Sequence, residues 1–258
     1  MKKVLLQLIV IIVFLFIGVK SGIATPKATD ILNRIDEGLR QKNDVTAKVN
    51  IVQKSKTKGV KDLKFLVFRK DSLDSFLMIF LSPETEKGNG YLKVGDNFWM
   101  YRRNTRTFQH ISRDEDVSGT NMKMGDMEKK KLTELYKPET DENGNEILKK
   151  EMLGKIPVYK FTIKAKVNDV TYPKIIYWVR RDNFLPLKEQ DFSLSGTLLR
   201  TSYYIKYTKI GGKYFLLKGL FVDEFEKGNK SLMNISNIST KPIEKTVFTK
   251  GYLENLSK

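Results

Sequence analysis

The chain has 258 residues, with 47 lysines and arginines against 30 aspartates and glutamates, and its formal net charge is +17 at pH 7. This length allows one large domain with a sizeable core, and the absence of cysteine excludes disulfides, thiolate metal sites and acylation on an N-terminal cysteine. The basic residues are spread along the whole sequence, which indicates either attraction to anionic surfaces and acidic partners or a lysine-rich proteome. No nucleic-acid-binding motif occurs, so no nucleic-acid partner is expected.

The first 24 residues have the pattern of a secretory signal peptide. A positively charged start precedes an apolar run from Val4 to Val19, and small residues stand at Gly22 and Ala24. The pattern predicts cleavage after Ala24 and a single exported domain, 25–258. The alternative is a retained membrane anchor, although the run is shorter than a spanning helix prefers. Export without cysteine favours a bacterial periplasm.

An amphipathic helix is predicted at the start of the exported part. Thr25 is a suitable N-cap, Pro26 suits the first helical position, and the helix is expected to end near Asn43. Apolar residues recur at helical spacing on one face, namely Ile31, Leu32, Ile35 and Leu39.

Period-two alternation, which is typical of β-strands, occupies most of the remaining chain. It predicts ten to twelve strands, at about 45–51, 63–67, 76–81, 91–94, 98–102, 107–111, 159–163, 174–179, 187–192, 198–207, 214–225 and 231–238. Short turns join most of them into an antiparallel meander. A sheet of this size must curl or close, so we expect a mainly β fold with helices, in which a curved sheet forms a half-open barrel closed by the N-terminal helix and a long loop.

Residues 112–145 interrupt this pattern. The segment is polar, contains three methionines without strand alternation, and carries one short predicted helix from Met127 to Tyr136. It is predicted to be a long mobile excursion from the sheet rather than a domain boundary, because the same strand pattern resumes after it.

No catalytic or metal-binding constellation is evident. The single histidine, His110, has no partner for a triad or a zinc site, and the acidic cluster 114–116 lacks the glycine and the ligand spacing of a calcium loop. We therefore expect no enzyme activity, no metal and no cofactor.

Several strands carry bulky apolar residues on both faces. The run from Phe98 to Tyr101 is the clearest, and 76–81, 175–178 and 215–217 are similar. Such a strand needs cover on both faces. Either both faces pack in a solid core, or the curved sheet encloses a cavity that the helix and the methionine-bearing loop cover as a lid.

The second interpretation gives a set of candidate residues. Within 98–101 we expect Trp99 and Tyr101, rather than Phe98 and Met100, to face the cavity. The candidate cavity residues are Phe65, Met78, Phe80, Trp99, Tyr101, Ile176 and Trp178, and the candidate lid residues are Ile31, Ile35, Leu39, Met122, Met124 and Met127.

Three segments resemble the LolA-like outer-membrane lipoprotein-sorting proteins. They are the run from Ser82-Pro83 through GYLKVGDNFWMYRRNTRTFQHIS, the strand-turn-strand IIYWVRRDNFLPLKEQDFSLSGTLLR, and the C-terminal VFTKGYLENL. The resemblance implies a half-open antiparallel barrel closed by helices around a hydrophobic cavity. The chain departs from the family pattern at 102–104, where a proline is common, and at the three methionines, where aromatic residues are common. Arg69 lies in the region of an arginine that holds the lid shut in carriers of the family, but no local motif fixes that alignment.

The resemblance also implies a function. It favours a periplasmic carrier that binds the acyl chains of lipoproteins or other lipids and delivers them toward the outer membrane. The expected partners are acylated lipoproteins or lipids, an inner-membrane transporter complex and an anionic membrane surface, and the carrier is expected to be a monomer. The alternatives are an RseB-like periplasmic sensor or an accessory binding subunit of an envelope transporter, with an enzyme as the third class.

Overall fold

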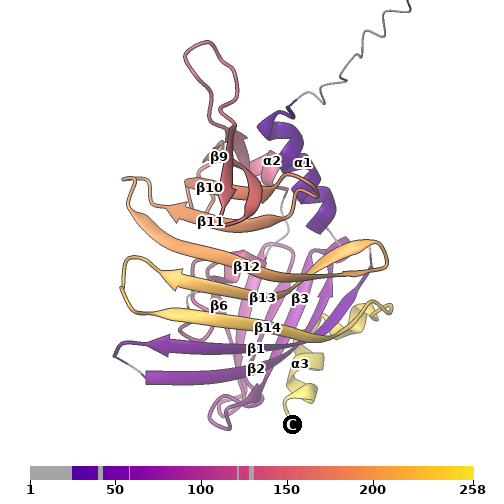
Figure 1. Cartoon of the computed structure of the whole chain (residues 1–258). Helices are drawn as coiled ribbons and strands as arrows, with labels where there is room; N and C mark the ends of the chain where they lie inside the picture. Colours follow the sequence, from indigo (N-terminus) through magenta and orange to yellow (C-terminus); the bar gives the residue numbers. More distant parts are fainter. Residues whose placement is uncertain (1–24, 40–42, 58, 121, 128–130) are drawn as a thin grey trace, which may run out of the picture.

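The computed structural model describes residues 25–39, 43–57, 59–120, 122–127 and 131–258 (Figure 1). The predicted signal peptide, 1–24, lies outside the described residues. Within the described part, no helix is long and apolar enough to cross a membrane.

A single curved antiparallel sheet dominates the molecule and does not close, which confirms the predicted fold class (Figure 1). The described residues contain fourteen strands in the order β6-β5-β4-β3-β2-β1-β14-β13-β12-β11-β10-β9-β7, and β8 pairs with β9. Their bounds are β1 Val45–Ser55, β2 Gly59–Lys70, β3 Ser75–Ser82, β4 Gly90–Val94, β5 Asn97–Arg102, β6 Thr107–Ile111, β7 Tyr136–Pro138, β8 Lys149–Leu153, β9 Ile156–Ala165, β10 Lys174–Arg180, β11 Pro186–Phe192, β12 Leu198–Ile210, β13 Lys213–Asp223 and β14 Lys230–Ser239.

The first and last strands of the chain are neighbours near the middle of the sheet. Thr46 of β1 is opposite Ser239 of β14, and the pairing continues to Lys54 and Lys230. The two ends of the sheet are therefore formed by strands from the middle of the sequence, β6 at one end and β7 with β8 at the other. The segment between β6 and β7 passes from one end of the sheet to the other.

Two groups of elements cover the inner face. The helix α1 (Ala28–Leu39) packs its apolar side on β9 and β10, where Ile31, Leu32 and Ile35 meet Phe161 and Tyr177. The described part of 112–127, which includes a 3-10 turn, η2 (Met124–Met127), covers the other half, and a short helix, α2 (Leu132–Leu135), packs beside α1. We call α1 and the described part of 112–135 the lid.

The outer face of β3 and β4 is covered by a C-terminal helix that the sequence patterns did not predict. This helix, α3 (Lys250–Leu256), contacts both strands and buries Leu253 fully against them. Thr249 caps it, because its hydroxyl accepts a hydrogen bond of 3.2 Å from the amide of Tyr252.

These covers explain the strand 98–101, which is apolar on both faces. Phe98 belongs to the inner cluster together with the partly buried Met100, whereas Tyr101 and Trp99 belong to the outer cluster beneath α3. The expectation that Trp99 and Tyr101 face the cavity is wrong. The physical reason is that α3 supplies an apolar surface outside the sheet, where these two side chains pack.

Each of the twelve predicted strands corresponds to a strand of the sheet, although the one predicted at 214–225 ends at Asp223, and two further strands appear. β7 has three residues and β8 has the sequence KKEML, so neither shows enough alternation to be recognised. The N-terminal helix begins at Ala28, after Thr25 and Pro26, and Asn43 lies outside it, while 40–42 are not described. The single helix predicted from Met127 to Tyr136 is instead split between η2, which ends at Met127, and α2, with β7 starting at Tyr136.

Candidate functional site

A cavity of about 450 Å³ lies between the inner face of the sheet and the lid. Most of its wall is apolar and comes from strands in the middle of the sheet. The apolar wall residues are Val45, Ala47, Val49 and Ile51 of β1, Val67 of β2, Met78 of β3, Phe215, Leu216 and Phe221 of β13, and Met233, Ile235 and Ile238 of β14.

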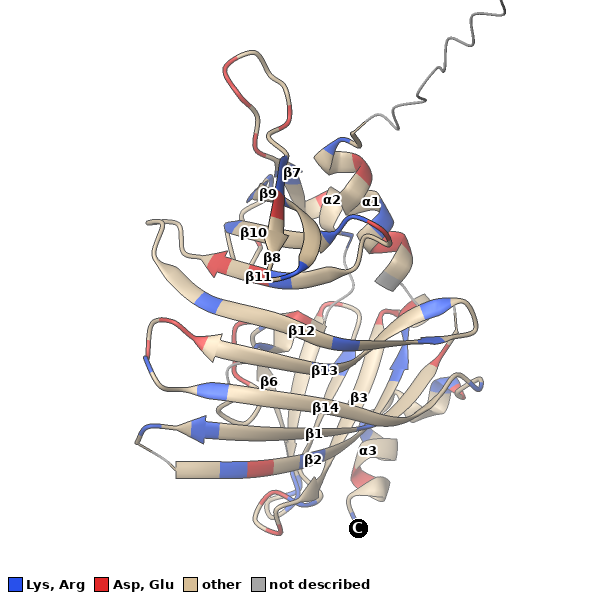
Figure 2. Ribbon diagram, viewed as in Figure 1, with Lys and Arg blue, Asp and Glu red and all other residues tan. Residues whose placement is uncertain are grey.

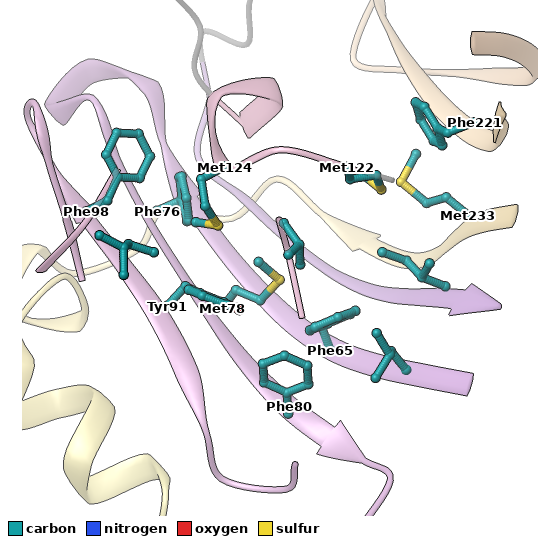
Figure 3. Packing of buried hydrophobic residues seen from close by; sticks show 14 residues of the cluster. Phe65, Phe76, Met78, Phe80, Tyr91, Phe98, Met122, Met124, Phe221 and Met233 are labelled. Atoms are coloured by element: carbon teal, nitrogen blue, oxygen red, sulfur yellow. The ribbon is translucent and has the colours of Figure 1, made fainter. Parts of the chain in front are cut away.

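The lid contributes apolar side chains from two directions. Ile35 comes from α1, and Met122 and Met127 come from the excursion, followed by Leu132 and Leu135 of α2. Figure 3 shows Met122 near Met233 of β14, within one cluster of buried apolar residues. Methionine is flexible and polarizable, so this part of the wall can adapt to ligands of different shape.

One end of the cavity is polar and is organised by Arg200 of β12. Its guanidinium donates to both carboxylate oxygens of Asp126 in the lid, at 2.5 and 3.0 Å, and its Nε donates to Asp191 of β11 at 2.7 Å. Glu189 lies 3.8 Å from the same guanidinium, which also stacks over the ring of Tyr172 at 4.7 Å. Burial lowers the pKa of Arg200, but the charges of Asp126 and Asp191 outweigh it and raise that pKa overall.

The carboxyl groups of Glu189 and Asp191 form a buried pair, because residues two apart on a strand share a face. Burial, reinforced by the charge of Glu189, raises the pKa of Asp191 well above its ordinary value. Oδ1 of Asp191 has no hydrogen-bond donor in the structure.

Tyrosines form much of the remaining wall at this end. Tyr204 donates its hydroxyl to Glu189 at 2.7 Å, Tyr207 donates to the carbonyl of Pro186 at 2.9 Å, and Tyr136 donates to the carbonyl of Tyr172 at 3.1 Å. Burial raises the pKa of all of these phenols, so they stay protonated and act as hydrogen-bond donors. The full set of lining tyrosines is Tyr136, Tyr172, Tyr177, Tyr204, Tyr207 and Tyr214.

Polar contacts attach the lid to the sheet at separate points. Besides the pair of Arg200 and Asp126, Arg69 of β2 donates from Nη1 to the carbonyl of Met127 at 3.0 Å. The side-chain amide of Gln53 donates to the carbonyl of Gly119, and the amide of Ser118 donates to the hydroxyl of Tyr91 at 3.1 Å.

The two helices of the lid are joined by a carboxylate. Asp36 of α1 accepts hydrogen bonds from the backbone amides of Leu132 and Thr133, at 2.9 and 3.2 Å, and from the hydroxyl of Thr133 at 3.1 Å. These amides open α2 and have no partner within that helix, so Asp36 supplies the cap that the sequence of α2 lacks.

The predicted residues divide into three groups. Met78, Met122, Met127 and Ile35 line the cavity. Phe65 and Phe80 of the sheet, Met124 of the excursion and Ile31 of α1 are buried between sheet and lid but lie outside the cavity wall, because they pack in the two apolar clusters. The side chain of Leu39 lies outside what the structure describes.

The third group lies on the opposite face of the sheet and corrects the prediction. Trp99 and Tyr101 pack under α3, and Ile176 and Trp178 alternate with Ile175, which faces α1. Trp178 is held between two ammonium groups, at 4.4 Å from Lys188 and 5.0 Å from Lys160. Its large apolar ring is therefore covered by lysine side chains on the outer surface rather than by a ligand cavity.

The polar end of the cavity was not foreseen. Glu189 and Asp191 stand in a strand of sequence PLKEQDF, in which charged residues occupy both faces, so no alternation marks the buried face. Arg200 similarly resembles an ordinary surface base. The available signal was the tyrosine-rich sequence of β12, because several phenols on one strand need hydrogen-bond partners when they are buried.

Within the described ranges, no group of three or more histidine, cysteine, aspartate or glutamate side chains is arranged to hold a metal ion. His110 lies on β6, with its Nε2 3.3 Å from Oδ1 of Asn97 and its ring edge against Trp99.

Comparison with known proteins places the chain in a family. A family model, described only as that of an uncharacterized protein, matches residues 72–255, which is more than half of the chain. A LolA superfamily protein from Nitrosomonas europaea has the same fold, with a TM-score of 0.74 and 23% identity over 88% of this chain and 100% of that one. The chain belongs to the family that this model describes, and it has the LolA-like fold. The resemblance that three sequence segments predicted is thus confirmed.

Other solved structures share the LolA-like fold at lower identity. An outer membrane lipoprotein-sorting protein domain from Vibrio parahaemolyticus is 16% identical, with a TM-score of 0.75 over 87% of this chain and 97% of that one. A DUF1329 family protein from Desulfovibrio piger is 18% identical, with a TM-score of 0.75 over 87% and 96%. A comparison with curated proteins found no significant match.

Proposed function

We propose that this LolA-like protein is an exported, periplasmic carrier that holds an acyl chain of a lipoprotein or another lipid in its cavity and delivers it toward the outer membrane. The observation that carries the proposal is the cavity of about 450 Å³ with a largely apolar wall beneath a lid. The signal-peptide pattern of residues 1–24 supports export. No residue of the described cavity is assigned a catalytic role.

The size of the cavity supports one acyl chain as the cargo of this conformation. A volume of about 450 Å³ accommodates about 15 groups of the size of a water molecule, at roughly 30 Å³ each, and a methylene is of similar size. Removing about 15 methylenes from water contributes ~12 kcal/mol before the cost of association, at ~0.8 kcal/mol each. A second chain requires the lid to move outward.

The polar end supports an orientation for the cargo. Arg200, Glu189 and the tyrosines have their polar groups at one end, and the apolar wall of β1, β13 and β14 forms the other. Because unpaired polar groups are costly against an acyl chain, the chain is expected in the apolar part, with the polar end of the lipid near the tyrosine hydroxyls. The carbonyl oxygens of an acyl ester are suitable acceptors for those hydroxyls.

Analysis of the purified protein tests the proposal. The full chain is expressed with export to a periplasm, purified without detergent and extracted with organic solvent, and the extract is examined by mass spectrometry. We expect about one acyl chain per protein. Repeated recovery without any acyl compound, together with failure to bind a fluorescent fatty-acid probe, would contradict a carrier function and favour the alternative of a protein-binding sensor or an accessory subunit.

A pair of variants ties binding to the cavity. Ala47 lines the cavity, whereas Val52, on the same strand, faces outward. Ala47→Phe is expected to lower affinity for the acyl probe at least tenfold because the ring occupies the space of the cargo, and Val52→Phe is expected to leave affinity unchanged. Equal affinities for both variants in a probe titration would show that the probe binds elsewhere; circular dichroism confirms that each variant is folded.

A further inference from the structure

Nearly all the charged residues on four adjacent strands are basic. β12, β14 and β1 contain no acidic residue, and β13 contains only its last residue, Asp223. Figure 2 shows the basic residues distributed along these strands, which lie side by side on one broad face of the molecule. The basic residues are Lys48, Lys54, Arg200, Lys206, Lys209, Lys213, Lys218 and Lys230, and among them only Arg200 is buried.

The strand register places an apolar row across the outer side of this face. Tyr203 is opposite Leu220, Leu220 is opposite Leu232, and Leu232 is opposite Val52. Successive side chains of a strand point to opposite faces of the sheet. The neighbours of these four residues along each strand face the cavity side, so the four side chains themselves point away from the cavity. Tyr203 is 37% exposed and the adjacent Ile205 is 53% exposed, so this row reaches solvent.

Lysines flank the apolar row on both sides. Lys206 is opposite Lys218 on one side, and Lys230 is opposite Lys54 on the other. Within the described part of the chain, none of these four lysines makes an ion pair. Like charges placed opposite each other on neighbouring strands are unfavourable, so the two lysine pairs raise the positive potential of this face, although Asp62 of β2 stands opposite Val52 at one end of the row.

The same face continues toward β11 with a further cationic group. Lys188 is opposite Tyr203 and lies between the rings of Tyr203 and Trp178, at 5.8 and 4.4 Å. Burial, and then the charge of nearby Lys160, lowers the pKa of Lys188, while the charge of Glu224 opposes this shift. An anion above this face relieves that repulsion.

We propose that the outer face of β12, β13, β14 and β1 docks on a membrane of anionic phospholipids. The combination of half-buried apolar side chains, an exposed tyrosine and flanking lysines matches the boundary between headgroups and acyl chains, where lysine stems lie along apolar surface and their ammonium groups reach phosphates. This docking face is on the opposite side of the sheet from the cavity, and it does not depend on the proposed cargo.

The type of basic residue distinguishes a membrane from a folded acidic partner. Every exposed base on these four strands is lysine, and the single arginine is turned inward. Lysine acts as a point charge on a flexible stem, whereas arginine provides a fixed two-pronged geometry that suits both carboxylates and phosphates held at defined positions. Because lysine imposes no fixed geometry, these lysines fit mobile headgroups better than a surface whose acidic groups are held in place.

Co-sedimentation with vesicles tests the proposal. Protein recovered from the periplasm and freed of bound lipid is mixed with vesicles of equal parts phosphatidylglycerol and phosphatidylcholine, or of phosphatidylcholine alone. We expect binding to the first at low salt, little binding to the second, and a decrease as salt is raised. The double variant Lys206→Gln/Lys218→Gln is expected to bind about 30-fold more weakly, at roughly 1 kcal/mol per lysine and 1.4 kcal/mol per tenfold.

The control variant removes the same charge elsewhere. Lys150→Gln/Lys155→Gln changes two exposed lysines at the hairpin of β8 and β9 and is expected to bind within about threefold of the unchanged protein. Equal losses in both double variants would mean that net charge alone attracts the protein, and absence of binding to phosphatidylglycerol would overturn the proposal. Capture of an acidic envelope protein without vesicle binding would assign the face to a protein partner instead. Acyl-probe affinity, measured in parallel, reports on the cavity separately.

Discussion

Arg200 connects the lid to the sheet through charge. It is a buried base whose partners come from three segments, namely Asp126 of the lid, Asp191 of β11 and the aromatic ring of Tyr172. A buried ion pair contributes little to stability compared with apolar packing, but a partner that is removed leaves a costly uncompensated charge. The network therefore fixes where the lid sits more than it stabilises the fold as a whole.

Asp191 is expected to make stability depend on pH in an unusual direction. Its pKa is raised in the folded state by burial, so its contribution to stability is complete below the ordinary aspartate pKa of about 3.9 and is lost as pH rises through the folded-state value. The side-chain amide of Asp191→Asn does not ionise. The variant is therefore expected to lose less stability than the unchanged protein as pH rises. Urea unfolding at a series of pH values from about 4 to 8 measures the difference.

Asp182 provides the control for this measurement. It is exposed, and the hydrogen bond from Arg180 lowers its pKa, so any contribution is present above about pH 4 and is lost as pH falls. Asp182→Asn should therefore follow the unchanged protein through the neutral range. If Asp191→Asn also runs parallel to the unchanged protein, the carboxyl is ionised in the folded state.

The small helix α3 has a large effect on how its neighbouring strands are built. It covers the outer face of β3 and β4, so Leu77 and Leu92 can be apolar there while Phe76 and Met78 remain in the inner core. Gly90 permits the close approach, because a Cβ at this position would lie 2.7 Å from Leu253 and 2.6 Å from the carbonyl oxygen of Met78.

Truncation of one side chain measures what α3 contributes. Leu253 of α3 is fully buried between the helix and the sheet. Leu253→Ala is expected to lower the free energy of unfolding by about 2 to 5 kcal/mol because it leaves a cavity. Leu256, which is 38% exposed on the same helix, is the matched control, and Leu256→Ala is expected to cost less than about 1 kcal/mol. Similar losses in thermal or urea unfolding would indicate that α3 is not a packed part of the fold.

The sequence predicted elements well where one periodicity extends over several turns or residues. The long strands and α1 follow from regular alternation and from the spacing of Ile31 and Ile35. The strand 98–101 is correctly predicted to have two covered faces, but the prediction of which face lines the cavity is wrong. The outer cover, α3, has only seven residues and one fully buried side chain, so its sequence does not reveal it as a cover. Local pattern shows that a face is apolar, and only tertiary structure shows what lies against it.

The candidate site was partly accessible by the same reasoning. The three methionines of the excursion are predicted as lid residues because methionine adapts to ligands of different shape, and Met122 and Met127 line the cavity whereas Met124 does not. Arg200 and Glu189 were missed because a buried charge on a strand looks like a surface charge until its partners on other strands are known. Trp178 is predicted in the cavity because 175–178 carries bulky apolar residues on both faces, whereas lysine side chains cover it on the outer surface.

One continuous sheet forms most of the molecule, and its first and last strands in chain order, β1 and β14, pair near its middle. Its inner side bears the cavity and the lid, and its outer side bears α3 over β3 and β4 and the lysine-flanked row over β12, β13, β14 and β1. The proposed cargo site and the proposed docking face are thus separated by the thickness of a single sheet. If both proposals hold, membrane contact on one side leaves the lid on the other side uncovered.

Hydrogen exchange is expected to reflect this architecture. β1 and β14 have hydrogen-bonded neighbours on both sides and lie mid-sheet, so their amides should exchange most slowly, whereas β6 and β7 at the two ends should exchange first. Exchange followed by mass spectrometry tests this order. Faster exchange in β1 than in β6 would mean that the two halves of the sheet separate before its ends fray.

The pairing of β1 with β14 also sets the order of events in biosynthesis. Thr46 leaves the ribosome early and Ser239 near the end, yet these residues face each other in the finished sheet. The central seam therefore closes only when almost the whole chain has been made, and contacts between residues so distant in sequence form slowly. A chain whose sheet closes this late stays unfolded for longer during synthesis. Passage through a narrow translocation channel requires an unfolded polypeptide.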